Sequence, residues 1–248
     1  MSEYLLSTSG LTKQFGHHKA VNNVDLHVKK GAIYGFIGRN GAGKTTFLKM
    51  ISGLSKPTDG EIQMFGYRNE ELKNVRSRIS CLIEAPGIYG NMSAYHNLAI
   101  KCRLFGINDS KYIENILKIV GLSEVGKKKT KHFSLGMKQR LGIGLALVGE
   151  PDLLVLDEPI NGLDPQGIAE IRDMLLRLKE EQNMTIIISS HILEELSKIA
   201  THYGIIHNGS LIQELTREEL MTRCSERMEL TLDDPKAALP ILPLNATF

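Results

Sequence analysis

The feature that most constrains the fold of this chain is a glycine-rich loop between a short apolar run and a helical pattern. Residues 32–37 have the composition of a fully buried strand, and residues 38–45 read Gly-Arg-Asn-Gly-Ala-Gly-Lys-Thr. Glycines let a backbone wrap closely around phosphate oxygens, and the helix that follows adds its positive N-terminal end. This order predicts a phosphate-binding loop. Its predicted nucleotide-binding residues are Gly38, Asn40, Gly41, Ala42, Gly43, Lys44, Thr45 and Thr46.

Two of these side chains have predicted chemical roles. Lys44 can reach the β- and γ-phosphates of a nucleotide, and the Thr45 hydroxyl can bind Mg²⁺. The alternative is a tight strand-to-helix turn with a chance lysine. Because the glycine positions, the lysine, the hydroxyl and the flanking pattern all agree, we favour the phosphate-binding interpretation.

Two more apolar runs, at 153–156 and 185–189, read as buried strands separated by helices. They indicate an α/β sheet with helices on both faces, in which ligands bind at the carboxyl ends of the strands. Residues 4–28 alternate loosely between polar and apolar, which predicts antiparallel strands around a turn at 16–18. Residues 93–145 read as almost wholly helical. The predicted fold is therefore a P-loop NTPase sheet with an N-terminal antiparallel β segment and a helical insertion.

Two adjacent carboxylates, Asp157 and Glu158, come directly after the apolar run at 153–156. Neighbouring residues of a strand point to different sides, so these two can have different roles. We expect Asp157 to bind Mg²⁺ and Glu158 to orient or deprotonate the water that attacks the γ-phosphate. The alternative is a solvated strand end that opens a turn at Pro159. With the phosphate loop, the pair predicts a nucleoside triphosphatase.

Composition excludes several other classes. The 248 residues have a formal net charge of +2, which is far from the basic balance typical of nucleic-acid binders, so no nucleic acid is expected. No run approaches the roughly 20 apolar residues that a membrane-spanning helix needs, and the first residues do not read as a secretory signal. Cys81, Cys102 and Cys224 have no short spacing, which argues against a zinc cluster and favours a reducing cytoplasm.

Further motifs resemble those of ABC transporter ATP-binding subunits. Residues 133–140, Phe-Ser-Leu-Gly-Met-Lys-Gln-Arg, are similar to the family's signature motif and precede the acidic strand. Residues 161–164, Asn-Gly-Leu-Asp, resemble its D-loop. His191 matches its switch histidine, and Phe15 matches the aromatic residue that stacks on adenine. The resemblance extends from about residue 4 to residue 212.

The resemblance implies an ATP- and Mg²⁺-dependent enzyme that works as a head-to-tail dimer, with a second copy or a homologous subunit. Ser134 can cap a helix starting near Leu135, and a helix N-terminus of this kind can bind an anion. In the family that anion is the γ-phosphate held by the other subunit, so Ser134 and Gly136 are expected at both the nucleotide and the dimer interface, with Asp164 beside them. His191 is expected at the γ-phosphate or the attacking water; by itself it could simply start a helix. Phe15 could instead be a core residue.

The chain also departs from the family pattern. Phe133, Leu135 and Met137 differ from the usual Leu-Ser-Gly-Gly-Gln, although Ser134 remains. After a predicted strand at 79–83, Glu84 stands where the family commonly has a glutamine that touches Mg²⁺ or its water. A carboxylate can bind Mg²⁺ but adds negative charge beside the phosphates. The predicted metal-binding residues are thus Thr45, Asp157 and Glu84.

The segments 82–89, 94–98 and 133–137 together resemble the subgroup that exports peptide antibiotics, of the bacitracin-resistance and lantibiotic-immunity type. This implies separate membrane-spanning permease chains that dock near 84–95, including Tyr89, and a location at the cytoplasmic face of the membrane. The alternatives are an ATP-binding subunit of a nutrient importer and a soluble ABC ATPase. We expect one ATP-binding domain over 1–230, with its helical subdomain at about 93–145, and a C-terminal tail over 231–248.

Overall fold

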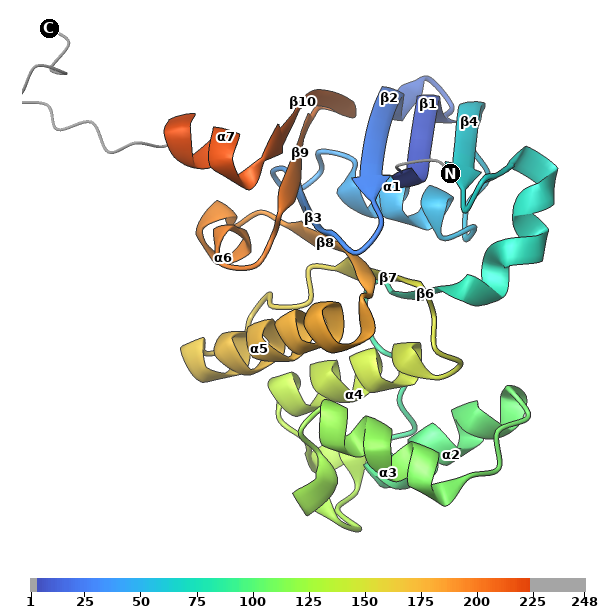
Figure 1. Cartoon of the computed structure of the whole chain (residues 1–248), viewed down its shortest axis with the longest axis vertical. Coiled ribbons are helices and arrows are strands. Elements are labelled where there is room, and N and C mark those ends of the chain that lie inside the picture. Colours follow the sequence, from blue (N-terminus) through green and yellow to red (C-terminus); the bar gives the residue numbers. More distant parts are fainter. Residues whose placement is uncertain (1–3, 224–248) are drawn as a thin grey trace, which may run out of the picture.

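The computed structural model describes residues 4–223, which form an α/β fold built on two sheets (Figure 1). The larger sheet has the strand order β10-β9-β3-β8-β7-β6. Its strands run parallel from β9 to β6, and β10 pairs antiparallel with β9. The bounds are β3 (Ile33–Ile37), β6 (Ile79–Leu82), β7 (Leu153–Asp157), β8 (Thr185–Ser190), β9 (His202–His207) and β10 (Ser210–Thr216).

The smaller sheet is antiparallel, has the order β2-β1-β4-β5, and lies with helix α1 at one end of the molecule (Figure 1). It corresponds to the predicted N-terminal β segment, extended by two later strands. A 3₁₀ segment, η1, leads from it to β6. The bounds are β1 (Tyr4–Phe15), β2 (His18–Lys29), α1 (Lys44–Ile51), β4 (Asp59–Met64), β5 (Tyr67–Arg68) and η1 (Asn69–Arg78).

The remaining helices cover the opposite face of the larger sheet or extend beyond it (Figure 1). In the predicted helical segment, three helices are separated by turns rather than being nearly continuous, and Gly106, Gly121 and Gly126 in those turns have positive φ. The bounds are α2 (Ala94–Leu104), α3 (Ser110–Ile119), η2 (Ser123–Val125), η3 (Thr130–His132), α4 (Leu135–Leu147), α5 (Pro165–Gln182), α6 (Leu193–Ser197) and α7 (Arg217–Arg223).

The central strands are apolar on both sides because each side faces a different core. Alternate residues of β7 divide between them: Leu153 and Val155 pack into the core around α1 and the smaller sheet, whereas Leu154 and Leu156 pack into the core under α4 and α5. All five residues of β7 are buried. This explains the near-continuous hydrophobic runs seen in the sequence, since parallel strands covered on both faces have no solvent-facing side.

Close packing joins α4 to the larger sheet. A Cβ atom on Gly142 would lie 2.7 Å from the Cβ of Pro86 and 3.2 Å from Leu82, so only glycine fits there. The segment that follows β6 is therefore held directly against α4. This contact connects the helical insertion with the edge of the sheet where the nucleotide site is expected.

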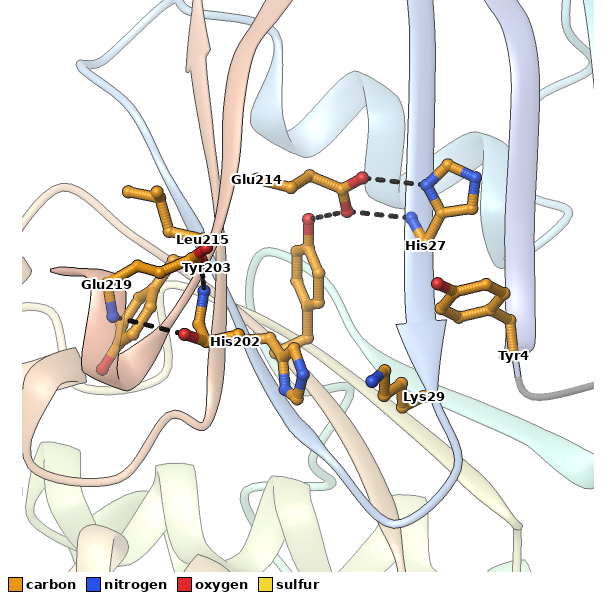
Figure 2. Close-up of a pocket in the computed structure, with 10 residues that line it drawn as sticks. Tyr4, His27, Lys29, His202, Tyr203, Glu214, Leu215 and Glu219 are labelled. Carbon is orange, nitrogen blue, oxygen red and sulfur yellow. Dashed lines mark hydrogen bonds and ion pairs between the residues drawn. The ribbon is translucent and has the colours of Figure 1, made fainter.

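The two sheets are also joined by a polar contact away from the phosphate loop (Figure 2). The Glu214 carboxylate accepts hydrogen bonds from the Tyr34 hydroxyl at 2.6 Å and the His27 backbone N–H at 2.9 Å, and its other oxygen lies 2.9 Å from His27 Nδ1. Burial and the neighbouring Glu214 raise the pKa of Tyr34 well above its ordinary value, so the phenol remains a hydrogen-bond donor. The contact ties β10 to both β2 and β3.

Within residues 4–223, no helix has the length and apolar character needed to cross a membrane. Cys81 and Cys102 are free thiols, and burial raises the pKa of each. The predicted tail at 231–248, the last residues of the predicted 1–230 domain and Cys224 lie outside the described residues.

Candidate nucleotide site

The phosphate loop connects β3 to α1 at the carboxyl end of the larger sheet. Gly43 has a φ of 105°, which is unfavourable for other residues, and a Cβ atom there would lie 2.4 Å from the Ala20 carbonyl oxygen. The Gly38 N–H donates to the Ser190 carbonyl at 3.3 Å, and the Gly209 N–H donates to the Ala42 carbonyl at 3.0 Å. The loop is thus held by the hairpin β1–β2, by β8 and by the turn between β9 and β10.

Lys44 folds back across this loop. Its side chain is only 6% exposed, and its ammonium donates to the carbonyls of Gly38 at 2.6 Å and Arg39 at 3.2 Å. The same ammonium lies 3.1 Å from Glu158 Oε1. The loop lysine and the predicted catalytic carboxylate are therefore brought together, as the sequence predicted for residues of one site.

Asp157 lies between two hydroxyl groups. Thr45 Oγ1 donates to Asp157 Oδ2 at 2.7 Å, and Ser189 Oγ donates to Oδ1 at 2.5 Å. Sequence reasoning missed Ser189, although a serine at the end of an otherwise isoleucine-rich strand was a signal. The parallel register places Ser189 opposite Asp157, which brings the two side chains to the same edge of the sheet.

These oxygen donors fit Mg²⁺. The ion prefers carboxylate, hydroxyl and phosphate oxygens, and usually takes one or two carboxylates from the protein and the rest from substrate and water. Thr45 and the mostly buried Asp157 supply a hydroxyl and a carboxylate in contact. Among residues 4–223, no group of three or more His, Cys, Asp and Glu side chains is placed to hold a metal ion.

Glu158 turns away from Asp157, toward His191. Glu158 Oε2 lies 2.9 Å from His191 Nδ1, and the Glu158 backbone N–H donates to Ser189 Oγ at 2.9 Å. Its φ of 48° is in the left-handed region, which for a glutamate costs roughly 1 kcal/mol. The local backbone therefore separates the two adjacent carboxylates. We call Lys44, Thr45, Asp157, Glu158, Ser189 and His191 the phosphate-loop cluster.

Glu84 reaches α1 rather than the phosphate-loop cluster itself. It lies two residues beyond β6, and its Oε1 is 2.6 Å from the Lys49 ammonium. Lys49 follows Thr45 by four residues in α1, so the two side chains lie on the same face of that helix. Glu84 therefore contacts the helix face that carries Thr45, a predicted Mg²⁺ ligand, and its own metal role stays a prediction.

The signature residues lie elsewhere. Ser134 caps α4 by accepting the Met137 N–H at 3.2 Å, and Leu135 is the first helical residue. Asp164 caps α5 by accepting the Gly167 N–H at 3.0 Å. An open hollow of about 490 Å³ lies between these helix ends, and no residue of the phosphate-loop cluster lines it. We call Ser134, Leu135, Gly136 and Asp164 the signature face.

Phe15 lies at the tip of the β1–β2 hairpin. Its side chain is 56% exposed, and the Lys13 ammonium is 5.2 Å from the centre of its ring. It is therefore a surface residue rather than a core residue, on the same hairpin whose Ala20 contacts the phosphate loop. An exposed ring on this hairpin is free to stack on a base, and the adenine role of Phe15 stays a prediction.

A parallel sheet with a glycine-rich loop after its central strand, and a buried aspartate beside the loop threonine, defines a P-loop nucleoside-triphosphatase fold. Within that class the chain belongs to the ABC transporter family, whose family model matches residues 21–161. The predicted family and fold class are both confirmed.

Relatives and solved structures agree with this assignment. The chain is 46% identical over 241 residues to the bacitracin transport ATP-binding protein BcrA of Bacillus licheniformis, which covers 96% of this chain and 78% of the relative. It is 43% identical over 210 residues to the lantibiotic transport ATP-binding protein SrtF of Streptococcus pyogenes, covering 85% of this chain and 90% of the relative. The structure of cbiO1 from Clostridium perfringens, part of the ABC transporter complex cbiONQ, matches with a TM-score of 0.80 at 26% identity, covering 89% of this chain and 92% of that one.

Proposed function

We propose that this chain is the ATP-binding and ATP-hydrolysing subunit of an ABC exporter for a peptide antibiotic of the bacitracin or lantibiotic type. The observation that carries the proposal is 46% identity over 96% of the chain to a bacitracin transport ATP-binding protein. The phosphate-loop cluster, which retains the lysine, both carboxylates and the histidine, supports hydrolysis. The likeness to such proteins favours an exporter over the nutrient importer and the soluble ATPase considered above.

The phosphate-loop cluster suits phosphoryl transfer to water. Lys44 supplies a positive charge, and the loop N–H groups cradle phosphate oxygens. Thr45 and Asp157 would hold Mg²⁺, which when bound neutralises charge on the β- and γ-phosphates. Glu158 would accept a proton from the attacking water. His191, 2.9 Å from Glu158, would orient that carboxylate or the water.

The position of the signature face supports a head-to-tail dimer. Gly136 and Ser134 open onto a hollow that holds no residue of the phosphate-loop cluster, so a second subunit is needed to bring the two sets of residues together. Leu135, which lines the same hollow, is 53% exposed and would be covered by such a partner. The partner is a second copy or a homologous subunit.

We also infer that membrane-spanning permease chains dock on the 84–95 segment. A cavity of about 300 Å³ there is lined by Pro86, Tyr89, Lys101 and Leu104, among others. The exposed fractions of Tyr89 and Leu104 are 57% and 79%, so the surface offers apolar side chains to a partner. This docking would place the chain at the cytoplasmic face of the membrane.

Antibiotic susceptibility tests the substrate class. Cells that carry the complete transporter with Glu158→Gln in this chain should become at least several-fold more sensitive to bacitracin or to a lantibiotic, and not to an aminoglycoside. The same strain with Glu180→Gln, an exposed change on α5, should keep wild-type resistance. Unchanged sensitivity to every peptide antibiotic tested would contradict the proposed substrate class, while loss of ATPase activity in the purified Glu158→Gln chain tests hydrolysis separately.

A further inference from the structure

One ion pair lies beside the nucleotide site without belonging to the phosphate-loop cluster. The Lys49 ammonium donates to Glu84 Oε1 at 2.6 Å. Their side chains are 36% and 66% exposed, so the pair is accessible to solvent and can exchange partners. Glu84 has a φ of 64°, in the left-handed region, which fixes the direction in which its side chain leaves the backbone.

The fold places this pair on the helix face and at the sheet edge that also carry the predicted Mg²⁺ ligands Thr45 and Asp157. Lys49 lies one helical turn beyond Thr45 on the same face of α1. In the larger sheet, β6 is the parallel neighbour of β7, with Leu82 opposite Leu156. Glu84 therefore follows β6 and Asp157 ends the neighbouring strand β7 at the same edge of the sheet. Glu84 is bonded to Lys49 of α1, and Asp157 is bonded to Thr45 of α1.

The charges explain why such a pair is useful. A carboxylate beside a triphosphate and Asp157 adds repulsion that an uncharged glutamine would not add. The Lys49 ammonium compensates this charge as long as the pair is formed. The same ammonium competes with a divalent cation for the Glu84 oxygens, since both are cations that require the same lone pairs.

We propose that Lys49 is a positioning residue for Glu84, which holds the carboxylate on α1 and releases it when Mg²⁺ and nucleotide bind. The inference rests on the proposed ATP-binding function and deepens it. The extent to which Mg²⁺ increases nucleotide affinity then depends on how readily Mg²⁺ replaces the Lys49 ammonium at Glu84. In a chain with glutamine at this position the acceptor is uncharged, so Lys49 would hold the side chain more weakly.

A calorimetric double-mutant cycle tests the proposal. The quantity measured is the ratio of the ADP dissociation constant in EDTA to that in excess Mg²⁺, which reports coupling without requiring hydrolysis. Lys49→Met keeps most of the aliphatic stem and removes the charge. Because Mg²⁺ then has no competitor for Glu84, the ratio should rise about two- to fivefold, as expected for an exposed ion pair. In the Glu84→Gln background, Lys49→Met should change the ratio by less than about 1.5-fold.

Arg78→Met is the matched control. Arg78 Nε is 2.7 Å from Asp152 Oδ2, in an ion pair of similar exposure at the amino end of the same strands, so its loss should leave the ratio unchanged. If Lys49→Met shifts the ratio equally in the wild-type and Glu84→Gln backgrounds, or not at all, Lys49 does not act through Glu84 and the proposal is wrong. Failure of the wild-type chain to bind ADP under either condition would instead overturn the proposed function, and this inference with it.

Discussion

The phosphate-loop cluster and the signature face differ in how their polar groups are satisfied. In the cluster, Asp157 is buried and bonded to two hydroxyls, and Lys44 is bonded to two carbonyls beside Glu158. On the signature face, the Ser134 hydroxyl accepts the Met137 N–H of its own helix, and Leu135 is exposed. One region is organised by contacts within the chain, whereas in the dimer proposed above the other would present its groups to a partner subunit. Four substitutions can break or sharpen this contrast.

The largest effect is expected for Glu158→Gln. An amide cannot accept a proton, and general-base catalysis contributes about 10²- to 10⁴-fold to a rate. Steady-state ATP turnover should fall by that factor, while ATP binding and a nucleotide-dependent dimer, followed by size-exclusion chromatography, should persist. Normal turnover in this variant would exclude Glu158 as the base. Glu180→Gln should leave turnover unchanged.

Ser134→Asp should damage turnover almost as strongly without destabilising the fold. Aspartate caps a helix about as well as serine, so the free energy of unfolding should stay within about 0.5 kcal/mol of the wild type. A carboxylate facing a partner's γ-phosphate, however, replaces a donor with a repelling charge, and turnover should fall about 10²-fold.

The control for Ser134→Asp is Asp109→Ser, which exchanges the capping residue of α3 in the reverse sense. It should affect neither turnover nor dimer formation. If Ser134→Asp hydrolyses ATP normally while remaining folded, the signature face does not meet a nucleotide, and the head-to-tail arrangement fails.

A moderate effect is expected for Ser189→Ala. This change removes the hydroxyl that donates to Asp157 and accepts the Glu158 N–H, so two groups at the site each lose a partner. Unfolding by denaturant should show a loss of about 1 to 3 kcal/mol. Nucleotide affinity should fall as well, by about tenfold if roughly 1.4 kcal/mol of that loss is expressed in binding.

Ser190→Ala provides the comparison for Ser189→Ala. Ser190 is equally buried, but its hydroxyl accepts the Ile192 N–H and does not contact Asp157. Its substitution should change stability without a matching loss of affinity. Equal losses of affinity in the two variants would mean that Ser189 has no special part in the site.

The smallest effect is expected at an exposed pair far from either region. The Arg78 hydrogen bond holds the pKa of Asp152 below its usual value. A carboxyl whose folded pKa is depressed stabilises the protein above its unfolded pKa of about 3.9, and the contribution is lost as pH falls through the folded pKa. Asp152→Asn should therefore cost at most about 1 kcal/mol at pH 7 in urea unfolding, and the difference should vanish at strongly acidic pH. A difference that grows as the pH falls would contradict this account.

Much of the fold followed from local patterns in the sequence. The apolar runs at 32–37, 153–156 and 185–189 predicted central strands, because residues covered on both faces are nearly all hydrophobic. The glycine loop placed α1. What local patterns could not supply were contacts between distant segments, such as Ser189 with Asp157 and Lys49 with Glu84. These contacts depend on the register between neighbouring strands and on which face of a helix is turned toward the sheet.

The helical insertion shows a different kind of miss. Apolar spacing predicted helix over nearly all of 93–145, but Gly106, Gly121 and Gly126 interrupt it with positive φ. Those glycines are visible in the sequence as possible breakers, and the helical prediction did not take them into account. Leu135, which differs from the residue in the usual signature motif, requires no unusual backbone conformation, since it begins α4 with ordinary helical geometry.

The strand order has a consequence for how the protein is made. β3 carries the phosphate loop, and its two neighbours in the sheet are β8 and β9, which begin at Thr185 and His202. At a synthesis rate of about 5 to 20 residues per second, β3 is therefore synthesised roughly 7 to 30 s before either neighbour. During that interval both edges of the apolar strand β3 lack a partner strand. Because the phosphate loop is not yet complete, ATP binding cannot stabilise it. The segment that carries the phosphate loop is thus open to wrong strand pairing until β8 and β9 are made.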